Sequence, residues 1–450
     1  MSDGLLTTQD ISLTSCMITG SSGQKLDFKN LVVEFNYFED LFGCGISGIL
    51  MINDSMGYIN ILQLQGSEVL TIKLDKPGLE LPIYGNYRIY TVSDRKQTNH
   101  TNQNYLLKFC SEELFLNEQY RFSKAYSKMT ISDMISDIAL NQMRIPQDKL
   151  YLDSTSGIRD IVVPNMKPLQ AINWLSSFAL ADGAKNIGAP YLFYEDRDGW
   201  KFHSILNLFK QNVYKTYQYN IKGTKSDDNP AVTDLNSEIV NVLKYEHVKN
   251  FDSVTASKTG VYHNKLHTVD PLRLKFGETE FNYNQYKQNS PASLNDHSMN
   301  PSAKNRFGDT LTDTSSVVKF CITTTGQSEN SYIKDKKIAV SENLVEQTVP
   351  LRNAQLSLFY INRMKIMIPG DVYMTVGRVI EFNLPQISYN KESRQKSADE
   401  FYSGKYLVTA VRHMLNQEGI FITALEICKE SSPTEINDFN NSDPEWSSLR

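Results

Sequence analysis

Apolar and polar residues alternate along much of the first hundred positions of this chain. Between positions 31 and 37, Val33, Phe35 and Tyr37 fall on one side of an extended backbone, and the residues between them fall on the other. Alternation with a period of two is typical of a β-strand with one buried and one solvent-facing side. Residues 1–111 are therefore predicted to form a β-barrel or β-sandwich of short strands separated by turns. The expected strands are 11–19, 31–37, 48–53, 69–74, 87–93 and 105–110.

The spacing of apolar residues becomes helical after this region. Thr130, followed three positions later by Asp133, is a helix-start signal, and Pro168 is an acceptable first residue of a second helix. Gly183 is a candidate end for the second helix. The apolar faces expected on the two helices are Ile131, Met134, Ile135 and Ile138, and Leu169, Ile172, Leu175 and Phe178.

A hairpin is expected next, with strands 191–194 and 200–203 joined by a turn at 196–199. Residues 222–236 are polar and predict a linker. Residues 112–235 are therefore predicted to be an α+β domain inserted between two β regions.

Strand patterns return after the linker and define a second β domain at 236–430, with a polar excursion near 288–345. The region 352–430 is predicted to be mainly β, because apolar residues alternate along it and turn residues punctuate it. The polar tail, 431–450, is expected to be flexible or ordered by a partner. The other expected strands are 239–248, 260–270 and 317–323.

Composition limits the function classes. The 450-residue chain has a net charge of −5, which argues against holding nucleic acid by neutralising its phosphates. Neither a secretory signal nor an apolar run of about 20 residues, the length of a membrane helix, is visible. The cysteines are odd in number and widely spaced along the chain, which predicts free thiols in a reducing compartment. They are Cys16, Cys44, Cys110, Cys321 and Cys428.

Two motifs could carry ligand chemistry, and each has a simpler explanation. Residues 43–48 match the glycine pattern of a dinucleotide site, but a strand rather than a helix follows, so a bend between strands is favoured. His263 and His267 have a spacing that suits zinc on a helix. Their surroundings predict a strand, in which residues four apart lie too far apart to share a metal.

Catalytic residues are not singled out by any motif. The sequence has no GxSxG elbow of a serine hydrolase. Adjacent acids at 112–113 and 195–196 could support glycoside hydrolysis, although solvated turns are the favoured explanation. The aromatic runs 35–38 and 214–219 are expected to pack in a core or an interface rather than bind sugars or bases. No catalytic, cofactor-binding or metal-binding residue is assigned, and no cofactor is expected.

Four segments in order resemble the central baseplate hub protein of contractile-tailed bacteriophages, whose fold is also found in the hub half of type VI secretion spike proteins. The segments are 35–54, 166–181 followed by 190–204, 258–270, and 366–385 with 403–430. The resemblance implies two antiparallel β-barrel tube domains and a peripheral α+β domain. It also implies a homotrimer whose six barrels surround a channel and adapt a six-fold tail tube to a three-fold spike.

On this reading the protein is a structural, non-enzymatic component of the virion, located in the tail baseplate and made in the host cytoplasm. Its expected partners are the tail spike protein, tail tube or tube-initiator proteins, and baseplate wedge proteins. DNA would pass through the channel without specific binding. The alternatives are a tail-associated peptidoglycan hydrolase, which needs two acids in a cleft, and a sugar-binding tail adhesin, which needs exposed aromatic residues.

Overall fold

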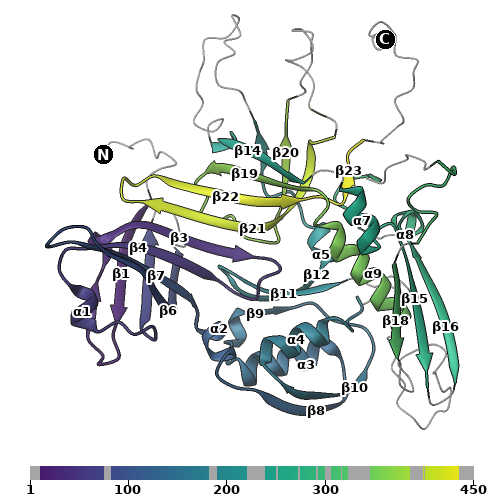
Figure 1. Ribbon diagram of the computed structural model, residues 1–450, viewed down its shortest axis with the longest axis horizontal. Coiled ribbons are helices and arrows are strands. Elements are labelled where there is room, and N and C mark those ends of the chain that lie inside the picture. Colours follow the sequence, from purple (N-terminus) through teal and green to yellow (C-terminus); the bar gives the residue numbers. More distant parts are fainter. Residues whose placement is uncertain are drawn as a thin grey trace, which may run out of the picture.

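The structure is a computed structural model in which a long, curved antiparallel sheet forms the body of the molecule (Figure 1). An α+β part lies below the middle of the molecule in this view, and a small three-stranded sheet with helices lies at the right, away from the first strands of the chain. The structure describes residues 11–75, 83–181, 190–219, 239–249, 252–271, 274–289, 292–298, 306–315, 317–322, 345–385, 399 and 401–434.

The first β half confirms the expected strands, with boundaries that extend some of them. Its strands are β1 (Ser12–Thr19), β2 (Lys25–Asp27), β3 (Val32–Asp40), β4 (Ser47–Asp54), β5 (Val69–Asp75), β6 (Ile83–Gln97) and β7 (Gln103–Ser111). Two short helical turns interrupt them, η1 (Lys29–Leu31) and α1 (Tyr58–Leu62). Phe35 and Tyr37 are buried, as the alternation predicts, and they pack in the core of this half. The alternation was wrong at the start of the strand, where Val32 is buried and Val33 only half-buried, and where the register with β4 shifts between Val32 and Glu34.

The α+β part confirms both predicted helix starts. In helix α3 (Ile131–Asp137), the Thr130 side chain accepts a hydrogen bond from the Asp133 amide, and helix α4 (Pro168–Ser176) begins at its proline. Helix α4 ends before Gly183, which lies outside the described residues. The other elements are α2 (Glu112–Asn117), β8 (Phe122–Met129), a π-helical turn (Ile138–Gln142), η3 (Gln147–Lys149), β9 (Leu150–Leu152), β10 (Arg159–Met166), β11 (Tyr191–Asp196), β12 (Gly199–Ser204) and α5 (Ile205–Phe209).

The predicted hairpin is present as β11 and β12, which pair from Tyr191 with Ser204 to Asp196 with Gly199. Strand β9 extends this hairpin to a three-stranded sheet, and β8 pairs with β10 in a separate two-stranded sheet. The expected linker at 222–236 lies outside the described residues. Helices α3 and α4 bury their predicted faces in one core cluster with the hairpin aromatics.

The second β half supplies β13 (Thr216–Gln218), β14 (Lys244–Lys249), β19 (Arg363–Pro369), β20 (Val379–Asn383), β21 (Gly404–Asn416) and β22 (Phe421–Cys428). The outlying part contains α7 (Ser253–Thr259), β15 (His263–Asp270), β16 (Lys275–Asn282), α8 (Tyr283–Asn289), β17 (His297–Ser298), β18 (Val317–Ile322), α9 (Val345–Leu358) and β23 (Ser431–Ser432). Strand β15 pairs with β16 and β18, which confirms strands near 260–270 and 317–323.

Three expectations for this half were wrong in detail. The strand expected at 239–248 begins only at Lys244, where the chain pairs with β19. The region 352–430 opens with helix α9 instead of a strand, and Pro350 lies inside that helix. The start of the expected tail is buried, since Ser431 and Ser432 pair with β17. Tertiary packing of these segments decides their conformation more strongly than the local pattern does.

One ladder joins the two β halves. Strand β21 pairs antiparallel with β3 from Ala410 opposite Asp40 to Asn416 opposite Glu34. A 13-stranded sheet results, with the central order β14-β19-β22-β21-β3-β4-β7-β6-β5-β1-β2. The fold is mainly β with an α+β part, as expected. Pairing among the described strands leaves this sheet open and does not close either half into a barrel.

The glycine-rich segment 43–48 leads into strand β4 and not into a helix, which supports the strand interpretation over a dinucleotide site. Gly48 lies opposite Phe109 of β7 and Tyr37 of β3. A Cβ at this position would lie 2.1 Å from Phe109 Cζ and 2.5 Å from the Asn36 carbonyl oxygen. The motif therefore ends in a glycine, Gly48, that is needed because the Phe109 ring packs directly against its backbone.

We predict that Gly48→Ala destabilises the first β half by about 1–3 kcal/mol, because the added methyl must displace a buried ring and backbone. Gly20→Ala is the matched control, since its Cβ would meet atoms no closer than 3.4 Å. The control is expected to change stability by less than about 0.5 kcal/mol. Melting temperatures of the two variants test this, and equal values would contradict the packing role of Gly48.

Candidate functional site

The turn between β11 and β12 lies where the three main parts of the chain meet. Glu39, near the end of β3, accepts a hydrogen bond from the Arg197 amide in this turn at 3.0 Å. Its other carboxylate oxygen accepts one from the Val376 amide of the second β half at 3.1 Å. One buried side chain thus connects the first β half, the α+β part and the second β half, and we call this contact the Glu39 joint.

Arg197 strengthens the joint with its side chain. Its Nη1 donates to the Val372 carbonyl oxygen at 2.9 Å, and its guanidinium lies 4.7 Å from the centre of the Tyr373 ring. The Arg197 side chain of the hairpin turn therefore holds the loop 371–378 through two contacts, one with a backbone carbonyl oxygen and one with an aromatic ring.

A buried histidine holds the same loop from the sheet side. His413 of β21 contacts the Met374 carbonyl oxygen through Nε2 at 3.1 Å and Thr423 Oγ1 through Nδ1 at 3.0 Å. A carbonyl oxygen can only accept, so Nε2 carries the proton and Nδ1 accepts from the threonine. Burial lowers the pKa of His413 to about 4, which keeps the ring neutral at physiological pH.

The acids at 195–196 are buried and bonded, so the expectation of solvated turns was wrong for them. Glu195 accepts a hydrogen bond from the Ile46 amide at 2.9 Å. Asp196 accepts from the amides of Asp198 and Gly199 at 3.0 and 3.2 Å, and it forms an ion pair with Lys201. These side chains are only 9% and 1% exposed, because strand β11 lies inside the junction rather than on the surface.

Burial also shifts the proton affinity of these acids. It raises the pKa of Glu39 from 4.5 to about 8, and the negative charge of Asp196 adds to the effect. The pKa of Glu195 is likewise raised to about 8, first by burial and then by the charge of Glu113. Burial raises the pKa of Asp196 too, although Lys201 opposes the shift. The junction therefore concentrates acids whose charged form is disfavoured.

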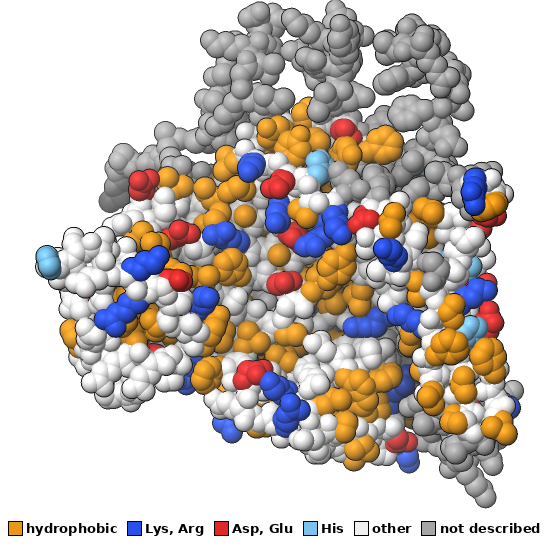
Figure 2. Space-filling model, in the orientation of Figure 1, with side chains coloured by type: hydrophobic (Ala, Val, Ile, Leu, Met, Phe, Trp, Pro, Cys, Tyr) orange, Lys and Arg blue, Asp and Glu red, His pale blue; other side chains and the backbone are white. Residues whose placement is uncertain are grey.

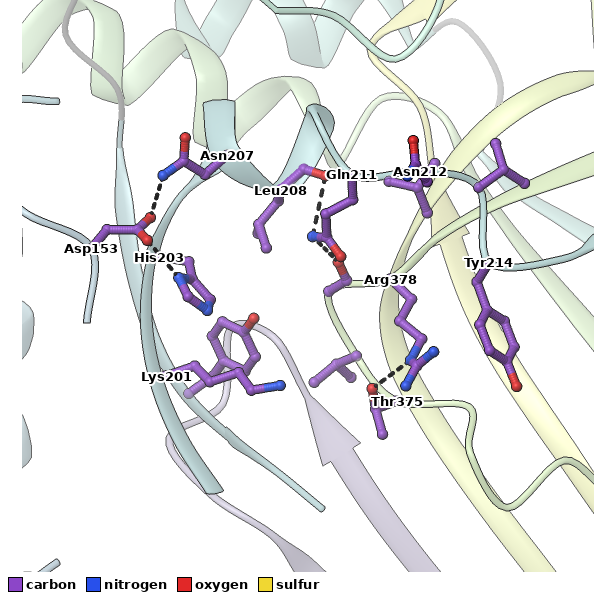
Figure 3. Close-up of a pocket in the computed structure, with 15 residues that line it drawn as sticks. Asp153, Lys201, His203, Asn207, Leu208, Gln211, Asn212, Tyr214, Thr375 and Arg378 are labelled. Atoms are coloured by element: carbon purple, nitrogen blue, oxygen red, sulfur yellow. Dashed lines mark hydrogen bonds and ion pairs between the residues drawn. The ribbon is translucent and has the colours of Figure 1, made fainter. Parts of the chain in front are cut away.

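A cavity of about 530 Å³ opens beside this junction, between the α+β part and the second β half (Figure 3). Its lining comes from β12, from α5 and the segment after it, and from residues 375–379. On one side, Asp153 accepts hydrogen bonds from His203 Nδ1 at 2.9 Å and Asn207 Nδ2 at 2.8 Å. On the other side, Arg378 Nε donates to Thr375 Oγ1 at 3.2 Å.

The His203–Asp153 pair lacks the third member of a hydrolytic triad. Ser204 follows His203 in the chain, but its hydroxyl caps α5 by accepting from the Asn207 amide at 3.2 Å. Within the described part of the chain, no serine, threonine or cysteine side chain is hydrogen-bonded to His203. The pair is better explained as an anchor of the β12–α5 connection, since Asp153 also accepts from the Ser204 amide at 2.9 Å.

The two histidines singled out by their spacing lie on strand β15, as expected. His263 faces Glu280 and His267 faces Glu278, each across 3.8 Å on strand β16. Four residues of strand separate the two rings by roughly 13 Å, too far to share one metal ion. Across the residues that the structure describes, no group of three or more histidine, cysteine or acidic side chains is placed to hold a metal.

The other residues singled out from the sequence make ordinary structural contacts. Glu112 forms an ion pair with Arg88. In the aromatic runs, Phe35, Tyr37 and Tyr217 are buried in cores, as expected. All five cysteines are free thiols, as predicted. No helix among the described residues is long and apolar enough to cross a membrane.

The sequence did not reveal Glu39, Arg197 or Arg378 as residues of a junction. Glu39 contacts an amide 158 positions away and another 337 positions away, so no local motif could connect them. The one available signal was an acid at the end of an apolar strand, where charge is costly unless it is bonded.

We predict that Glu39→Gln changes how stability depends on pH. An acid whose folded pKa is raised binds its proton more tightly in the folded state, so it favours folding below about pH 4.5 and loses that contribution as pH rises to about 8. The amide cannot ionise. The melting temperature of the variant relative to wild type should therefore rise between pH 5 and pH 8.5.

Glu34→Gln is the control for this experiment, because Glu34 lies on the same strand with its side chain 41% exposed. Its melting temperature should keep a constant offset from wild type across the same range. A constant offset for Glu39→Gln as well would contradict ionisation of Glu39 as a source of the pH dependence.

Comparison with known proteins gives an independent view of the chain. No family model matches it. It is 22% identical over 420 residues to a probable baseplate hub protein of Vibrio phage KVP40, and the match covers 90% of this chain and 92% of that protein.

Two solved structures share its fold. A tail protein from Neisseria meningitidis MC58 has a TM-score of 0.52 at 9% identity, covering 92% of this chain and 96% of that one. The 43 kDa tail protein of prophage MuSo2 from Shewanella oneidensis has a TM-score of 0.52 at 7% identity, covering 92% and 98%. The resemblance inferred from the sequence is confirmed: over about nine-tenths of its length this chain is similar to a probable phage baseplate hub protein, and it shares its fold with these two tail proteins.

Proposed function

We propose that this protein is the central hub of a phage tail baseplate, a structural component of the virion. The observation that carries this proposal is the match to a probable baseplate hub protein over 90% of this chain and 92% of that protein. A match along both whole chains argues for a shared overall role rather than for one shared domain.

We further propose that three copies assemble into a ring around a channel that joins the six-fold tail tube to the three-fold spike. Each chain has two β halves, so a trimer contains six. Such a ring can present six similar halves to a six-fold tube and three identical chains to a three-fold spike. The tail tube or its initiator proteins, the spike and the wedge proteins would contact different faces. A net charge of −5 suits a channel through which DNA passes without specific binding.

The division of the chain into 1–111, 112–235, 236–430 and 431–450 remains part of this proposal. The main core clusters support it in outline, because one core is built mostly from the first β half and another from the α+β part. The core of the second β half also takes in residues from β11 and α5, which ties the inserted part to it.

The surface also supports assembly with other chains. On the outlying sheet, Phe276, Phe320 and Ile322 are 58%, 73% and 76% exposed, and Leu274 beside them is 90% exposed. Figure 2 shows hydrophobic side chains gathered over this sheet. Contiguous apolar surface of this kind is usually covered in an assembly.

The burial and hydrogen bonding of the acidic side chains favour a structural role over peptidoglycan cleavage. A glycosidase needs two carboxyl groups facing a substrate cleft. Glu39, Glu195 and Asp196 are instead buried, and each accepts hydrogen bonds from backbone amides. An adhesin would present aromatic residues for sugars, whereas the aromatic runs of this chain are largely in cores.

We predict that the purified chain forms a trimer in solution. Three copies of a 51.3 kDa chain have a mass of about 154 kDa. Light scattering coupled to gel filtration, over a range of protein concentrations, measures this mass directly.

A persistent 51.3 kDa monomer, both alone and mixed with the candidate spike protein, would overturn the trimeric hub. A turbidity assay on purified cell walls runs in parallel. Loss of turbidity would instead favour the hydrolase.

A further inference from the structure

The cavity beside the Glu39 joint has a lining that is polar and already organised. Its walls carry the side-chain amides of Asn207, Gln211 and Asn212 together with the charged residues Asp153, Lys201 and Arg378. A volume of about 530 Å³ falls within the usual range of about 300–1,000 Å³ for ligand sites. Figure 3 places these side chains around one shared space.

Among the charged side chains of this lining, Asp153 and Lys201 have hydrogen-bonding or ion-pair partners that offset their charge, and Arg378 is the exception. Asp153 accepts three hydrogen bonds, from His203, the Ser204 amide and Asn207. Lys201 forms an ion pair with the buried Asp196. Arg378 has no carboxylate partner within ion-pair distance in the described part of the chain, although its neighbour Lys215 pairs with Asp371 at 3.1 Å.

Arg378 is held in a fixed position while its terminal nitrogens stay available. Its Nε donates to Thr375 Oγ1, and its guanidinium lies 4.3 Å from the centre of the Tyr214 ring. That ring is itself fixed, because the Tyr214 hydroxyl donates to Asp371 at 3.1 Å. Anchoring one edge and one face of a guanidinium leaves its other donors to bind an anion.

We propose that this cavity binds a carboxylate, which Arg378 recognises through its free guanidinium edge. A single unmatched positive charge suits a monoanion, and the Asp153 carboxylate in the same lining disfavours a phosphate dianion. The Gln211 amide oxygen supplies an acceptor, and the Asn212 amide supplies a donor and an acceptor, for the polar groups next to the carboxylate. This inference does not depend on the proposed hub function.

Gln211 shows how the rest of the lining is prepared. Its Nε2 donates to the Leu208 and Gly377 carbonyl oxygens at 3.3 and 3.0 Å, which bridges the α5 wall and the loop wall. The two walls of the cavity are therefore kept at a fixed separation. Preorganisation of this kind lowers the entropic cost of binding.

The carboxylate can come from a free small acid or from an acidic side chain of a protein. Butyrate represents the first source, and the blocked peptide acetyl-Ala-Glu-Ala-amide represents the second; each carries a single carboxylate. Butyramide and acetyl-Ala-Gln-Ala-amide are their neutral counterparts. Each probe is titrated calorimetrically into the full-length wild-type chain in its native oligomeric state.

We expect at least one charged probe to bind saturably, and its neutral counterpart to bind about tenfold more weakly or worse. Arg378→Gln should weaken the charged probe by about tenfold or more, and Arg378→Lys should retain part of the affinity. Arg95→Gln, which removes an exposed arginine on β6, is the matched control and should bind as wild type does. The probe that binds identifies the source of the carboxylate.

Absence of binding by both charged probes would overturn the proposal. So would equal affinity of wild type and Arg378→Gln, or equal binding of a charged probe and its neutral counterpart to wild type. The last comparison uses only the wild-type chain, so the proposal stays testable even where Arg378→Gln does not fold. Circular dichroism of each variant establishes its fold before titration.

Discussion

The arrangement of this chain depends on how one buried carboxylate is satisfied. Glu39 ends a strand of the first β half in a position from which water is excluded, so its oxygens need partners from the protein. The partners are backbone amides from the hairpin turn and from the loop 371–378. Leaving either oxygen unpaired would carry the desolvation cost of a buried polar group, which fixes the turn and the loop relative to the strand.

The long β21–β3 ladder and the Glu39 joint perform different tasks. The ladder makes one sheet of two β halves, but a ladder alone leaves the sheet free to twist. The joint adds a contact out of the plane of the sheet, because the hairpin turn reaches it from the α+β part. His413 then holds the loop from the sheet side through the Met374 carbonyl. Together these contacts fix the arrangement of the three parts of the chain.

Local signals predicted the local elements of this chain well. Thr130 and Asp133 marked a helix start because an N-cap depends only on neighbouring residues, and the alternation around Phe35 marked β3 for the same reason. The failures have a common cause. Helix α9 tolerates Pro350, and residues 195–196 are buried, because segments far apart in the sequence surround them. The resemblance anticipated the similarity to a phage baseplate hub protein, whereas the joint and the bridge between the cavity walls depend on contacts between residues more than 100 positions apart and could not be read from spacing.

The loop 371–378 couples the junction to the cavity. Val376 donates its amide to Glu39, while Thr375 and Arg378, on either side of it, form one wall of the cavity. Movement of the hairpin turn away from Glu39 would break the Arg197 amide bond to Glu39 and the Arg197 side-chain bond to the Val372 carbonyl oxygen, which anchors the loop that carries Arg378. A carboxylate bound at Arg378, as proposed above, would by the same linkage favour the arrangement in which these bonds are made, because coupling between two sites is reciprocal. One loop therefore connects the proposed carboxylate cavity with the contact that holds the three parts of the chain together.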